Sequence, residues 1–477
     1  MAPVLPILDD LEQRDLIAEV THRDELAKLL ADGRVTLYAG YDPTSPSLHI
    51  GNLVPTMLLR RFQLAGHRPL VLVGGATGMV GDPSGKSTER NLLDDATLAA
   101  NLAGIRAQLE RLLDFTDPNT GAVIVNNYDW TKGISYLEFL RDIGKYLTIN
   151  YMLAKDSVKN RLARAADGTA DGMSYTEFSY MLLQGFDFVH LAKTHDCRLQ
   201  VGGSDQYGNI TTGGEMSRKM GGPQLYGLVA PLMLDSTGEK MGKTSTGERV
   251  SLDPAQFSPF KFYQYWFNTS DDDAIRFLKM FSVRPLTEVL EVISKHDQDR
   301  GKRIAQRELA RDMTSWVHGA ASVTSAEAAS RVMFGEPLDG LTDADLGAVA
   351  GIVDTIEVPR AELESGVAIV ELVARAFKES KSNARRLVEG GGSSINNVSV
   401  RSPELDELKR SLADVTKQAA AATDDKAKLE ESRNAMTTKV EELKKELLGR
   451  KVTLANLATE TMLVVSSGRK RCLVRAV

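Results

Sequence analysis

The chain contains 477 residues, of which 42% are hydrophobic and 26% charged, and its formal net charge is −6. This composition is typical of a globular protein with about two to four domains. No apolar run approaches the roughly 20 residues of a membrane-spanning helix, and secretion is not expected because the N-terminus lacks a signal-peptide pattern. Cys197 and Cys472 have no metal-ligand spacing. We therefore expect a cytoplasmic protein with no membrane segment and no metal site, in which nucleic-acid binding would depend on local basic patches.

Short apolar strands alternate with amphipathic helices in the first half of the chain. The expected strands are 35–38, 69–73, 122–125, 198–201 and 228–233, with helices such as 98–115 and 136–143 between them. This alternation predicts an α/β fold over residues 1–257, a Rossmann-like doubly wound parallel sheet. Ligands of such sheets bind at the carboxyl ends of the strands.

The second half is mainly helical and ends in a smaller mixed region. We expect a helical domain over 258–345, a linker over 346–366, and a small α+β domain made of 367–402 and 449–477. Within the small domain the pattern predicts a helix over 367–380 and a strand over 394–400.

A heptad pattern interrupts the small domain over residues 403–448. Apolar or small residues recur at three- and four-residue steps among many Lys and Glu residues, which predicts a coiled coil. The unbroken phase favours one helix of roughly 65 Å. A helical hairpin that turns near 421–425 is the alternative, because it returns the chain to complete the small domain.

The run from Tyr38 to Asn52 is the first candidate nucleotide-binding motif. A strand ends near Tyr38, a turn with Asp42 and Pro43 follows, and His49 and Gly51 come directly before an apolar helix. Unpaired N–H groups and the positive dipole end make such a helix start a suitable seat for phosphate.

The run Lys240-Met-Gly-Lys-Thr244 is a second motif with phosphate chemistry. It follows an apolar strand and a turn, and it carries two lysines beside a glycine and a hydroxyl. Such cations suit a loop that closes over a triphosphate and stabilises the departing pyrophosphate. Alone, this pattern is more often a solvated loop, so its weight comes from its pairing with the first motif.

A polar stripe follows the sequence Ser174-Tyr-Thr-Glu177, which reads as a capping box at the start of a helix. Tyr180, Gln184 and Asp187 then fall at i, i+4 and i+7, on one helix face. A phenol, an amide and a carboxylate in this order suit a zwitterionic ligand with a hydroxyl group. A solvated helix face is the alternative interpretation.

The two motifs resemble the His-Ile-Gly-His and Lys-Met-Ser-Lys-Ser signatures of class I aminoacyl-tRNA synthetases, with Asn52 in the last position of the first. With the stripe, the chain resembles the bacterial-type tyrosyl-tRNA synthetases over residues 8–400 and 450–477. The resemblance implies a ligase that attaches L-tyrosine to tRNA(Tyr) in two steps, tyrosyl-adenylate formation and transfer to the terminal adenosine. ATP is then a substrate, Mg²⁺ is expected with it, and a homodimer is expected through residues near 128–153.

The resemblance also implies roles for individual residues. The tyrosine-binding residues would be Tyr38, Thr77, Asp82, Tyr180, Gln184, Asp187, Gln200 and Gln206. The ATP-binding residues would be Gly40, Asp42, His49, Gly51, Asn52, Gly203, Asp205 and Lys243. Charge on the leaving pyrophosphate would be stabilised by Thr44, His49, Lys86, Arg90, Lys240, Lys243 and Thr244. The small domain resembles an S-four-type RNA-binding domain, with Arg385, Arg386, Arg469, Lys470 and Arg471 as the candidate RNA contacts.

Three other functions are alternatives to this one. A tryptophanyl enzyme is the closest, although the pair Tyr38 and Asp187 favours a phenol as the ligand. An RNA-binding or splicing-assistance protein could keep the fold without catalysis. A P-loop phosphotransferase is excluded, because only three residues separate Gly81 from Gly85, one fewer than that motif requires.

Overall fold

The computed structural model describes residues 5–84, 94–169, 171–236, 238, 241–244, 246–350, 352–421 and 425–477. The predicted site residues Lys86, Arg90 and Lys240 lie outside these ranges. The chain divides into two compact units, residues 1–319 and 320–477. This division differs from the boundaries expected at 257 and 345, since the predicted helical domain is divided between the two units.

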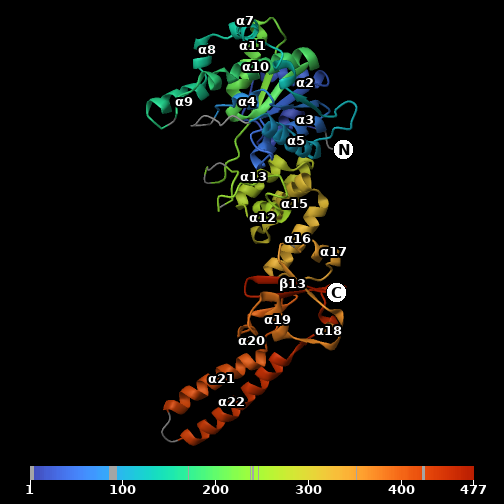
Figure 1. The fold of residues 1–477 in the computed structure, drawn as a ribbon, viewed down its shortest axis with the longest axis vertical. Coiled ribbons are helices and arrows are strands. Elements are labelled where there is room, and N and C mark those ends of the chain that lie inside the picture. Colours follow the sequence, from blue (N-terminus) through green and yellow to red (C-terminus); the bar gives the residue numbers. More distant parts are fainter. Residues whose placement is uncertain are drawn as a thin grey trace. The chain divides into compact units, whose positions relative to one another are not determined.

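The first unit is built on a six-stranded sheet, coloured blue to green in Figure 1. Its strand order is β1-β6-β5-β2-β3-β4, and all neighbours are parallel except β1, which pairs antiparallel to β6. The α/β prediction is confirmed, with the correction that the sheet is mixed. The strands are β1 (Glu19–Val20), β2 (Thr36–Tyr41), β3 (Arg68–Val73), β4 (Val123–Asn126), β5 (Cys197–Gly203) and β6 (Tyr226–Ala230).

The chain order reverses at β2, which lies between β3 and β5. Strands β3 and β4 extend the sheet on one side of β2, and β5 and β6 extend it on the other. A ligand crevice is expected outside the carboxyl ends of the strands at such a switch point. The predicted motifs that follow β2, β3 and β5 therefore converge on one edge.

Helices of the first unit surround the sheet and continue into a helical part. α3 contacts β2, β3 and β5, and α10 contacts α11 and β5. In the helical part, α12, α13 and α15 pack together around the fully buried Trp266. The helices are α1 (Ile7–Gln13), α2 (Arg23–Asp32), α3 (Leu53–Leu64), α4 (Thr77–Val80), α5 (Asp95–Leu112), α6 (Tyr128–Thr131), α7 (Tyr136–Asp142), α8 (Ile149–Leu153), α9 (Asp156–Ala166), α10 (Tyr175–His195), α11 (Tyr207–Lys219), α12 (Pro259–Phe267), α13 (Asp271–Phe281), α14 (Leu286–Gln298) and α15 (Ile304–His318).

The second unit has a five-stranded sheet with the order β10-β9-β12-β13-β7. Its strands are β7 (Asp354–Val358), β9 (Ser393–Ile395), β10 (Val398–Ser399), β12 (Met462–Ser467) and β13 (Lys470–Ala476), and β8 (Val367–Ala368) pairs with β11 (Lys451–Val452). Its helices are α16 (Ala320–Phe334), α17 (Asp343–Gly347), α18 (Arg360–Ser365), α19 (Ile369–Phe377), α20 (Lys381–Glu389), α21 (Pro403–Ala421) and α22 (Lys426–Gly449).

Two predicted segments of this unit differ from the structure. The expected linker over 346–366 contains β7, which pairs in parallel with β13 and so belongs to the sheet. The expected strand over 394–400 is a tight hairpin of β9 and β10. The chain turns at Asn396 and Asn397, whose φ angles of 50° and 64° lie in the left-handed region that asparagine tolerates.

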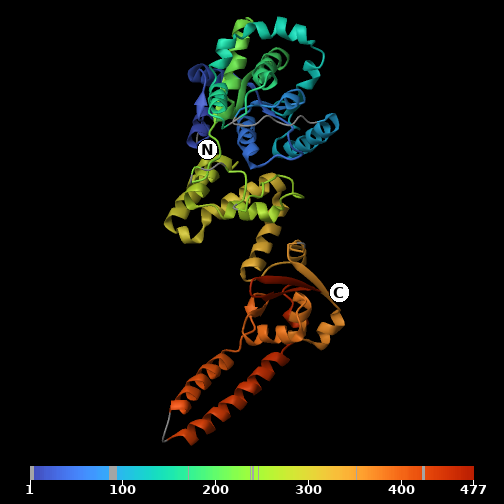
Figure 2. The same cartoon turned by 60° about the vertical axis from the view of Figure 1, so that its left-hand side comes forward.

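The interrupting segment forms two helices, α21 and α22, which lie side by side in both views (Figures 1 and 2). This is the two-helix alternative. Leu405, Val440, Leu443 and Leu447, near the base of the pair, belong to the hydrophobic core of the unit. The apolar seam therefore continues from that core along the helix pair.

Candidate functional site

The carboxyl ends of β2 and β3 bring polar side chains from three segments together. Asp42, which follows β2, accepts hydrogen bonds from the Thr77 hydroxyl at 2.8 Å and from the Tyr180 hydroxyl at 3.0 Å. Gly74, which follows β3, lies so close that a Cβ atom there would be 2.2 Å from the Asp42 Oδ1 atom. A side chain at position 74 would therefore displace the Asp42 carboxylate. Three predicted site residues, 35 to 138 positions apart, meet at one carboxylate.

Asp187 lies deeper on α10 and is 2% exposed. Its carboxylate accepts from the Asn127 Nδ2 atom at 2.9 Å and from the Trp130 Nε1 atom at 2.8 Å. Asn127 also donates to the Thr77 hydroxyl at 3.0 Å. These two partners follow the carboxyl end of β4 and were missed in the sequence. The signal that could have found them is their position directly after a predicted strand.

Three buried polar atoms in this region have no hydrogen-bond partner among the described residues: the Tyr38 hydroxyl, the Gln184 Oε1 atom and the Gln200 Oε1 atom. Tyr38 and Gln200 are register partners on β2 and β5. Burial is the main cause that raises the pKa of Tyr38 well above its usual value, followed by Asp187 and Cys197. The phenol is therefore neutral and able to donate. Unpaired buried polar groups are rare in folded proteins, so these atoms point to a polar ligand.

A second carboxylate, Asp82, lies in a network with the amides of α10 and the segment after β5. The Gln206 Nε2 atom donates to Asp82 Oδ2 at 2.6 Å, and the Gln184 Nε2 atom donates to Gln206 Oε1 at 3.2 Å. The backbone N–H of Ser84 donates to Asp82 Oδ1 at 2.9 Å. The two carboxylates, Asp42 and Asp82, raise the pKa of Tyr180 further after burial has raised it most. This arrangement suits a cationic group.

Asp187 predicts a pH dependence of stability. Burial raises its pKa to about 7, and Asp42 raises it too, although the bonds from Asn127 and Trp130 act in the opposite direction. The usual aspartate pKa is about 3.9. Between these values the folded state binds a proton that the unfolded state lacks, so the contribution of Asp187 to stability falls as pH rises from about 4 to about 7.

The variant Asp187→Asn keeps the shape but stays neutral. The difference in free energy of unfolding, variant minus parent, should be larger at about pH 8 than at about pH 5 by about 1 kcal/mol or more. The parent loses the contribution of protonated Asp187 over this range, and one pKa unit corresponds to about 1.4 kcal/mol. Urea unfolding at both pH values measures this difference, and any pH-independent packing defect cancels from it. An equal effect of the substitution at both pH values would contradict the raised pKa.

His49 starts the short 3-10 helix Ile50–Asn52, which leads directly into α3. Its Nδ1 atom accepts from the Gly51 N–H at 3.0 Å, and the backbone N–H of His49 donates to the Asn52 Oδ1 atom at 3.0 Å. A Cβ atom on Gly51 would lie 2.7 Å from the imidazole. The glycine and Asn52 therefore fix the imidazole at the helix start.

The lysine-bearing segment lies beside His49. Ser251 pairs with His49 in an antiparallel bridge, and Lys243 pairs with Arg249 in another. Hydrogen bonds join the same strands, from the Ile50 N–H to the Val250 carbonyl at 3.2 Å and from the Val250 N–H to the Gly242 carbonyl at 3.0 Å. Residues 241–244 and 246–251 thus form a hairpin, here called the lysine hairpin, one strand of which lies against the His49 segment.

The remaining predicted nucleotide-site residues lie at the ends of the central strands or on this hairpin. Gly40 is exposed although it belongs to the central strand β2. Thr44 is exposed after the same strand, and Asp205 is exposed just after β5, where a Cβ atom on Gly203 would be 2.7 Å from the Asp205 carboxylate. The Thr244 N–H donates to the Glu248 carbonyl within the hairpin at 2.8 Å.

A separate cavity of about 770 Å³ borders β4, α5 and α10. Its lining includes Trp130, His190 and His195, and it contains none of the predicted site residues. His190 stacks on Trp130 at a centroid distance of 4.4 Å, which agrees with a structural role for this histidine. The contacts described above, rather than this cavity, define the candidate site.

In the second unit the predicted basic residues lie on helix α20 and at the turn between β12 and β13. Arg385 and Arg386 are exposed on α20, and Arg469 and Lys470 are exposed at the turn between β12 and β13. The Gly468 N–H in that turn donates to the Gly392 carbonyl after α20 at 2.9 Å. Arg471 differs, because its guanidinium donates to the carbonyls of Val332, Gly468 and Lys470 and so anchors the main chain.

Comparison with known proteins gives consistent results. A family model described as tRNA synthetases class I (W and Y) matches residues 30–335. The tyrosine–tRNA ligase of Rhodopirellula baltica is 48% identical over 396 residues, which cover 83% of this chain and 89% of that protein. The tyrosine–tRNA ligase of Opitutus terrae is 47% identical over 398 residues, 83% of this chain and 92% of that protein.

Solved structures of tyrosyl-tRNA synthetases also resemble this chain. The C-terminally truncated mitochondrial tyrosyl-tRNA synthetase of Aspergillus nidulans superposes with a TM-score of 0.63 at 32% identity, covering 69% of this chain and 94% of that one. The corresponding protein of Coccidioides posadasii gives a TM-score of 0.59 at 35% identity, covering 68% of this chain and 92% of that one.

No helix within the described ranges is both long and apolar enough to cross a membrane.

Proposed function

Because the chain belongs to the class I tRNA synthetases (W and Y) and matches tyrosine–tRNA ligases over most of its length, we propose that the site at β2, β3, β5 and α10 forms tyrosyl-adenylate. The activity is the ATP-dependent attachment of tyrosine to tRNA through an aminoacyl-adenylate. One observation carries the site assignment: the bridges His49–Ser251 and Lys243–Arg249 bring the two signature motifs to one place.

We assign the buried end of the site to the tyrosine side chain. The Tyr38 hydroxyl, unpaired among the described residues, would donate to the substrate phenol, and the Asp187 carboxylate would accept from it. Asn127 and Trp130 donate to Asp187 and so orient its carboxylate for this bond. Gln200 is the register partner of Tyr38 on β5. Its Oε1 atom, which has no partner among the described residues, would also contact the substrate.

The substrate ammonium would lie between the two carboxylates at the outer end of α10. Asp82 and Tyr180 are the closest candidates, with Thr77, Gln184 and Gln206 in the surrounding network. Asp42 would orient Tyr180 through the 3.0 Å bond and also face the nucleotide side. A buried cation is favourable here because charge-assisted hydrogen bonds replace its hydration.

The tyrosine carboxylate would attack the α-phosphorus of ATP, and pyrophosphate would leave. We assign His49, Lys243 and Thr244 to the phosphate groups, with Thr44, Lys86, Arg90 and Lys240 as further candidates. Gly40, Gly51, Asn52, Gly203 and Asp205 would contact the nucleoside. Mg²⁺ would accompany the triphosphate on phosphate oxygens. Catalysis then depends on positioning and on cations that stabilise the developing charge.

The rival functions predict different substrates. A tryptophanyl enzyme would activate tryptophan, and a fold kept only for RNA binding would activate no amino acid. Asp187 and the neutral Tyr38 hydroxyl, an acceptor and a donor in one buried region, favour a hydroxyl-bearing substrate. Tyrosine-dependent exchange of pyrophosphate into ATP, compared with the same assay using tryptophan, separates all three.

Lys243→Ala tests the site assignment. We expect kcat of the exchange reaction to fall about 10²- to 10³-fold, the usual effect of removing one group that stabilises transition-state charge. The KM for tyrosine should change little, because the lysine hairpin lies at the nucleotide side. Lys261→Ala is the control, since Lys261 is exposed and pairs with Glu248 of the same hairpin at 2.9 Å. Equal exchange rates in the two variants would remove Lys243 from the site.

We propose that the enzyme is a homodimer through residues near 128–153. Apolar side chains there are exposed: Leu137 at 75%, Tyr136 at 63% and Ile149 at 60%. Tyr128 and Leu153 are each 40% exposed in the same region. A run of exposed apolar residues of this kind typically marks a protein interface.

We propose that the basic turns of the second unit contact tRNA. The Lys470 ammonium lies 3.6 Å from the Glu379 carboxylate, which accepts from Asn383 of α20 at 3.2 Å. This network connects the turn carrying Arg469 to the helix carrying Arg385 and Arg386. Adjacent exposed cations of this kind suit the phosphates of a nucleic acid.

A further inference from the structure

The N-terminal half of α13 contacts the segment 231–236, which follows β6 and leads into the lysine hairpin. The Ser236 N–H donates to the Asp273 Oδ2 atom at 3.1 Å, and the Arg276 guanidinium donates to the Leu234 carbonyl. Arg276 also pairs with Asp273 Oδ1 at 2.9 Å. Asp273 is 6% exposed. One buried carboxylate and one guanidinium therefore bind two main-chain groups at the base of the hairpin.

Segment 231–236 is hydrogen-bonded to the segment that carries Lys243. The Met241 N–H donates to the Met233 carbonyl at 2.9 Å, one residue before Leu234. Lys243 follows Met241 by two residues and pairs with Arg249, next to the strand that lies against His49. A shift of Leu234 or Ser236 would thus move the strand from which Lys243 projects.

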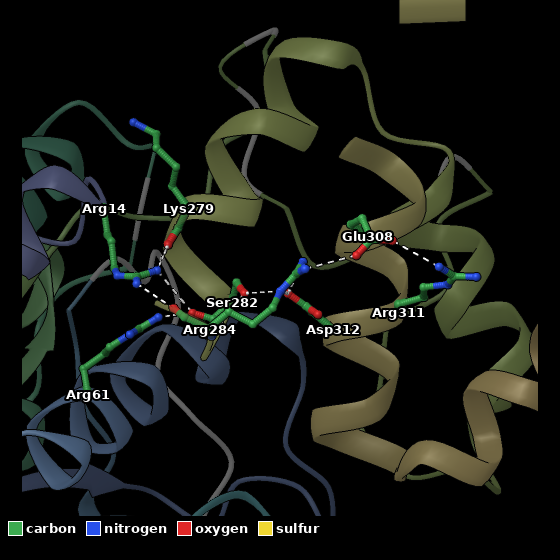
Figure 3. Close-up of polar contacts among 8 residues, drawn as sticks. All are labelled: Arg14, Arg61, Lys279, Ser282, Arg284, Glu308, Arg311 and Asp312. Atoms are coloured by element: carbon green, nitrogen blue, oxygen red, sulfur yellow. Dashed lines mark hydrogen bonds and ion pairs between the residues drawn. The ribbon is translucent and has the colours of Figure 1, made fainter. Parts of the chain in front are cut away.

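The other end of α13 is fixed to the helix that begins after His49. Ser282, the C-terminal cap of α13, offers its carbonyl to Arg14 at 3.2 Å and also to Arg61 (Figure 3). Arg61 lies in the last turn of α3, and Asn52 comes directly before that helix. The same helix α13 is therefore bonded to the lysine hairpin at one end and to the His49 helix at the other.

We propose that α13 is a strut that sets the position of Lys243 relative to His49, and that Asp273 and Arg276 are positioning residues for adenylate formation. Hydrogen-bonded contacts make a closed circuit: His49, α3, Arg61, Ser282, α13, Asp273 with Arg276, the lysine hairpin, Ser251, and back to His49. The proposal rests on the proposed role of Lys243.

The physical reason lies in the geometry that phosphate transfer requires. A displacement of about 1 Å in a catalytic cation can reduce the rate on the order of 10²-fold. A helix is a rigid spacer, and its ends here carry charged groups of the favourable sign. Asp273 lies in the first turn of α13, near the positive dipole end, and Arg14 and Arg61 bind the last carbonyls, near the negative end.

The test begins with Asp273→Asn and Arg276→Met in tyrosine-dependent pyrophosphate exchange. Methionine retains a stem that can pack on Phe277, whose ring lies 4.6 Å from the guanidinium carbon. We expect kcat to fall about 10- to 100-fold with an unchanged KM for tyrosine. Arg276→Lys should restore part of the loss. Asp272→Asn is the matched control, because Asp272 is 84% exposed and contacts Arg300 at 3.7 Å.

The decisive step repeats Asp273→Asn and Arg276→Met in a Lys243→Ala background. If the strut acts through Lys243, neither substitution should reduce kcat by more than about two-fold further, because residues of one functional unit are non-additive. Full additivity with Lys243→Ala, a matching rise in the KM for tyrosine, or parental kcat would each overturn the proposal.

Two measurements distinguish a failure of the proposed role of α13 from a failure of the proposed role of Lys243. Lys243→Ala alone tests the proposed function, so a normal rate in that variant defeats the site assignment. A slow Lys243→Ala variant combined with additive Asp273→Asn defeats only the strut. Thermal unfolding of each variant identifies loss of folding, and Arg276→Met, in which a 38% exposed side chain is replaced, provides the result if Asp273→Asn does not fold.

Discussion

Asp187→Ala is expected to abolish the preference of the enzyme for tyrosine over phenylalanine. Sites that pair a substrate hydroxyl reject the analogue lacking it by about 10⁴–10⁵, a magnitude for which tyrosyl-tRNA synthetases are themselves the standard example. Phenylalanine would leave the buried Tyr38 hydroxyl without an acceptor, and it would bring no donor to the buried Asp187 carboxylate. Without the carboxylate this penalty falls for phenylalanine, while tyrosine loses its acceptor.

The ratio of kcat/KM for tyrosine to that for phenylalanine, in pyrophosphate exchange, measures this effect. We expect it to fall by at least about 10³-fold in Asp187→Ala, mostly through the tyrosine value. Asp196→Asn is the control, because Asp196 caps the same helix but its side chain is 86% exposed. A parental ratio in Asp187→Ala would exclude this residue from the side-chain pocket, whatever the absolute rate.

The pocket helix illustrates what the sequence could predict. The spacing of Tyr180, Gln184 and Asp187 follows helical periodicity, so their common face could be read directly. Their partners could not, because Asp42 lies 138 residues from Tyr180 and reaches it only through the sheet register. The capping pattern was partly right: Ser174 accepts from the Glu177 N–H, but the Glu177 carboxylate pairs with the buried Arg161 at 3.3 Å.

The convergence of the two signatures was predicted from resemblance, and its physical form was not. Ser251 carries no pattern that marks it as the partner of His49, since an isolated bridge has no periodicity. Asn127 and Trp130 were overlooked for a related reason: one amide and one indole after an edge strand read as ordinary turn residues. Their role depends on the position of Asp187, which is a tertiary property.

The fold shows the same limit at its short elements. β1 has two residues, too few for any hydrophobic alternation, so the antiparallel edge of the sheet was invisible. β7 lies in a stretch rich in Gly, Asp and Pro, which reads as a linker although Val358 is buried. The heptad phase continued across both α21 and α22, so periodicity alone favoured a single helix. The helix pair returns the chain to the second unit, where β11 follows α22 and pairs with β8. A single long helix would not return the chain in this way.

Arg14→Leu is expected to destabilise the first unit by about 3–5 kcal/mol, the usual effect of breaking a buried ionic contact. Arg14 is fully buried. It pairs with Asp10 at 2.9 Å and donates to the carbonyls of Lys279, Ser282 and Arg284 (Figure 3). The substitution would remove the Arg14 donor from all three carbonyls and leave only Ser282 with a second guanidinium partner, Arg61. Each buried group that loses its partner costs about 1–3 kcal/mol.

Arg23→Leu is the matched control. Arg23 also pairs with a carboxylate, Glu12 at 2.6 Å, but its side chain is 39% exposed and that of Glu12 is 60% exposed. Exposed ion pairs contribute only about 0–1 kcal/mol. Urea unfolding followed by tryptophan fluorescence reports on the relevant unit, because all three tryptophans, Trp130, Trp266 and Trp316, lie in residues 1–319.

Two guanidinium groups, those of Arg14 and Arg61, are buried at the Ser282 carbonyl. Burial and the nearby Arg14 lower the pKa of Arg61 to about 10, so Arg61 is still charged near neutral pH. Asp10 and the carbonyl end of α13 together offset the two charges. Arg14→Leu should therefore shift the midpoint far more than Arg23→Leu. Similar midpoints for the two variants would mean that the joint between α1, α3 and α13 depends on apolar packing instead.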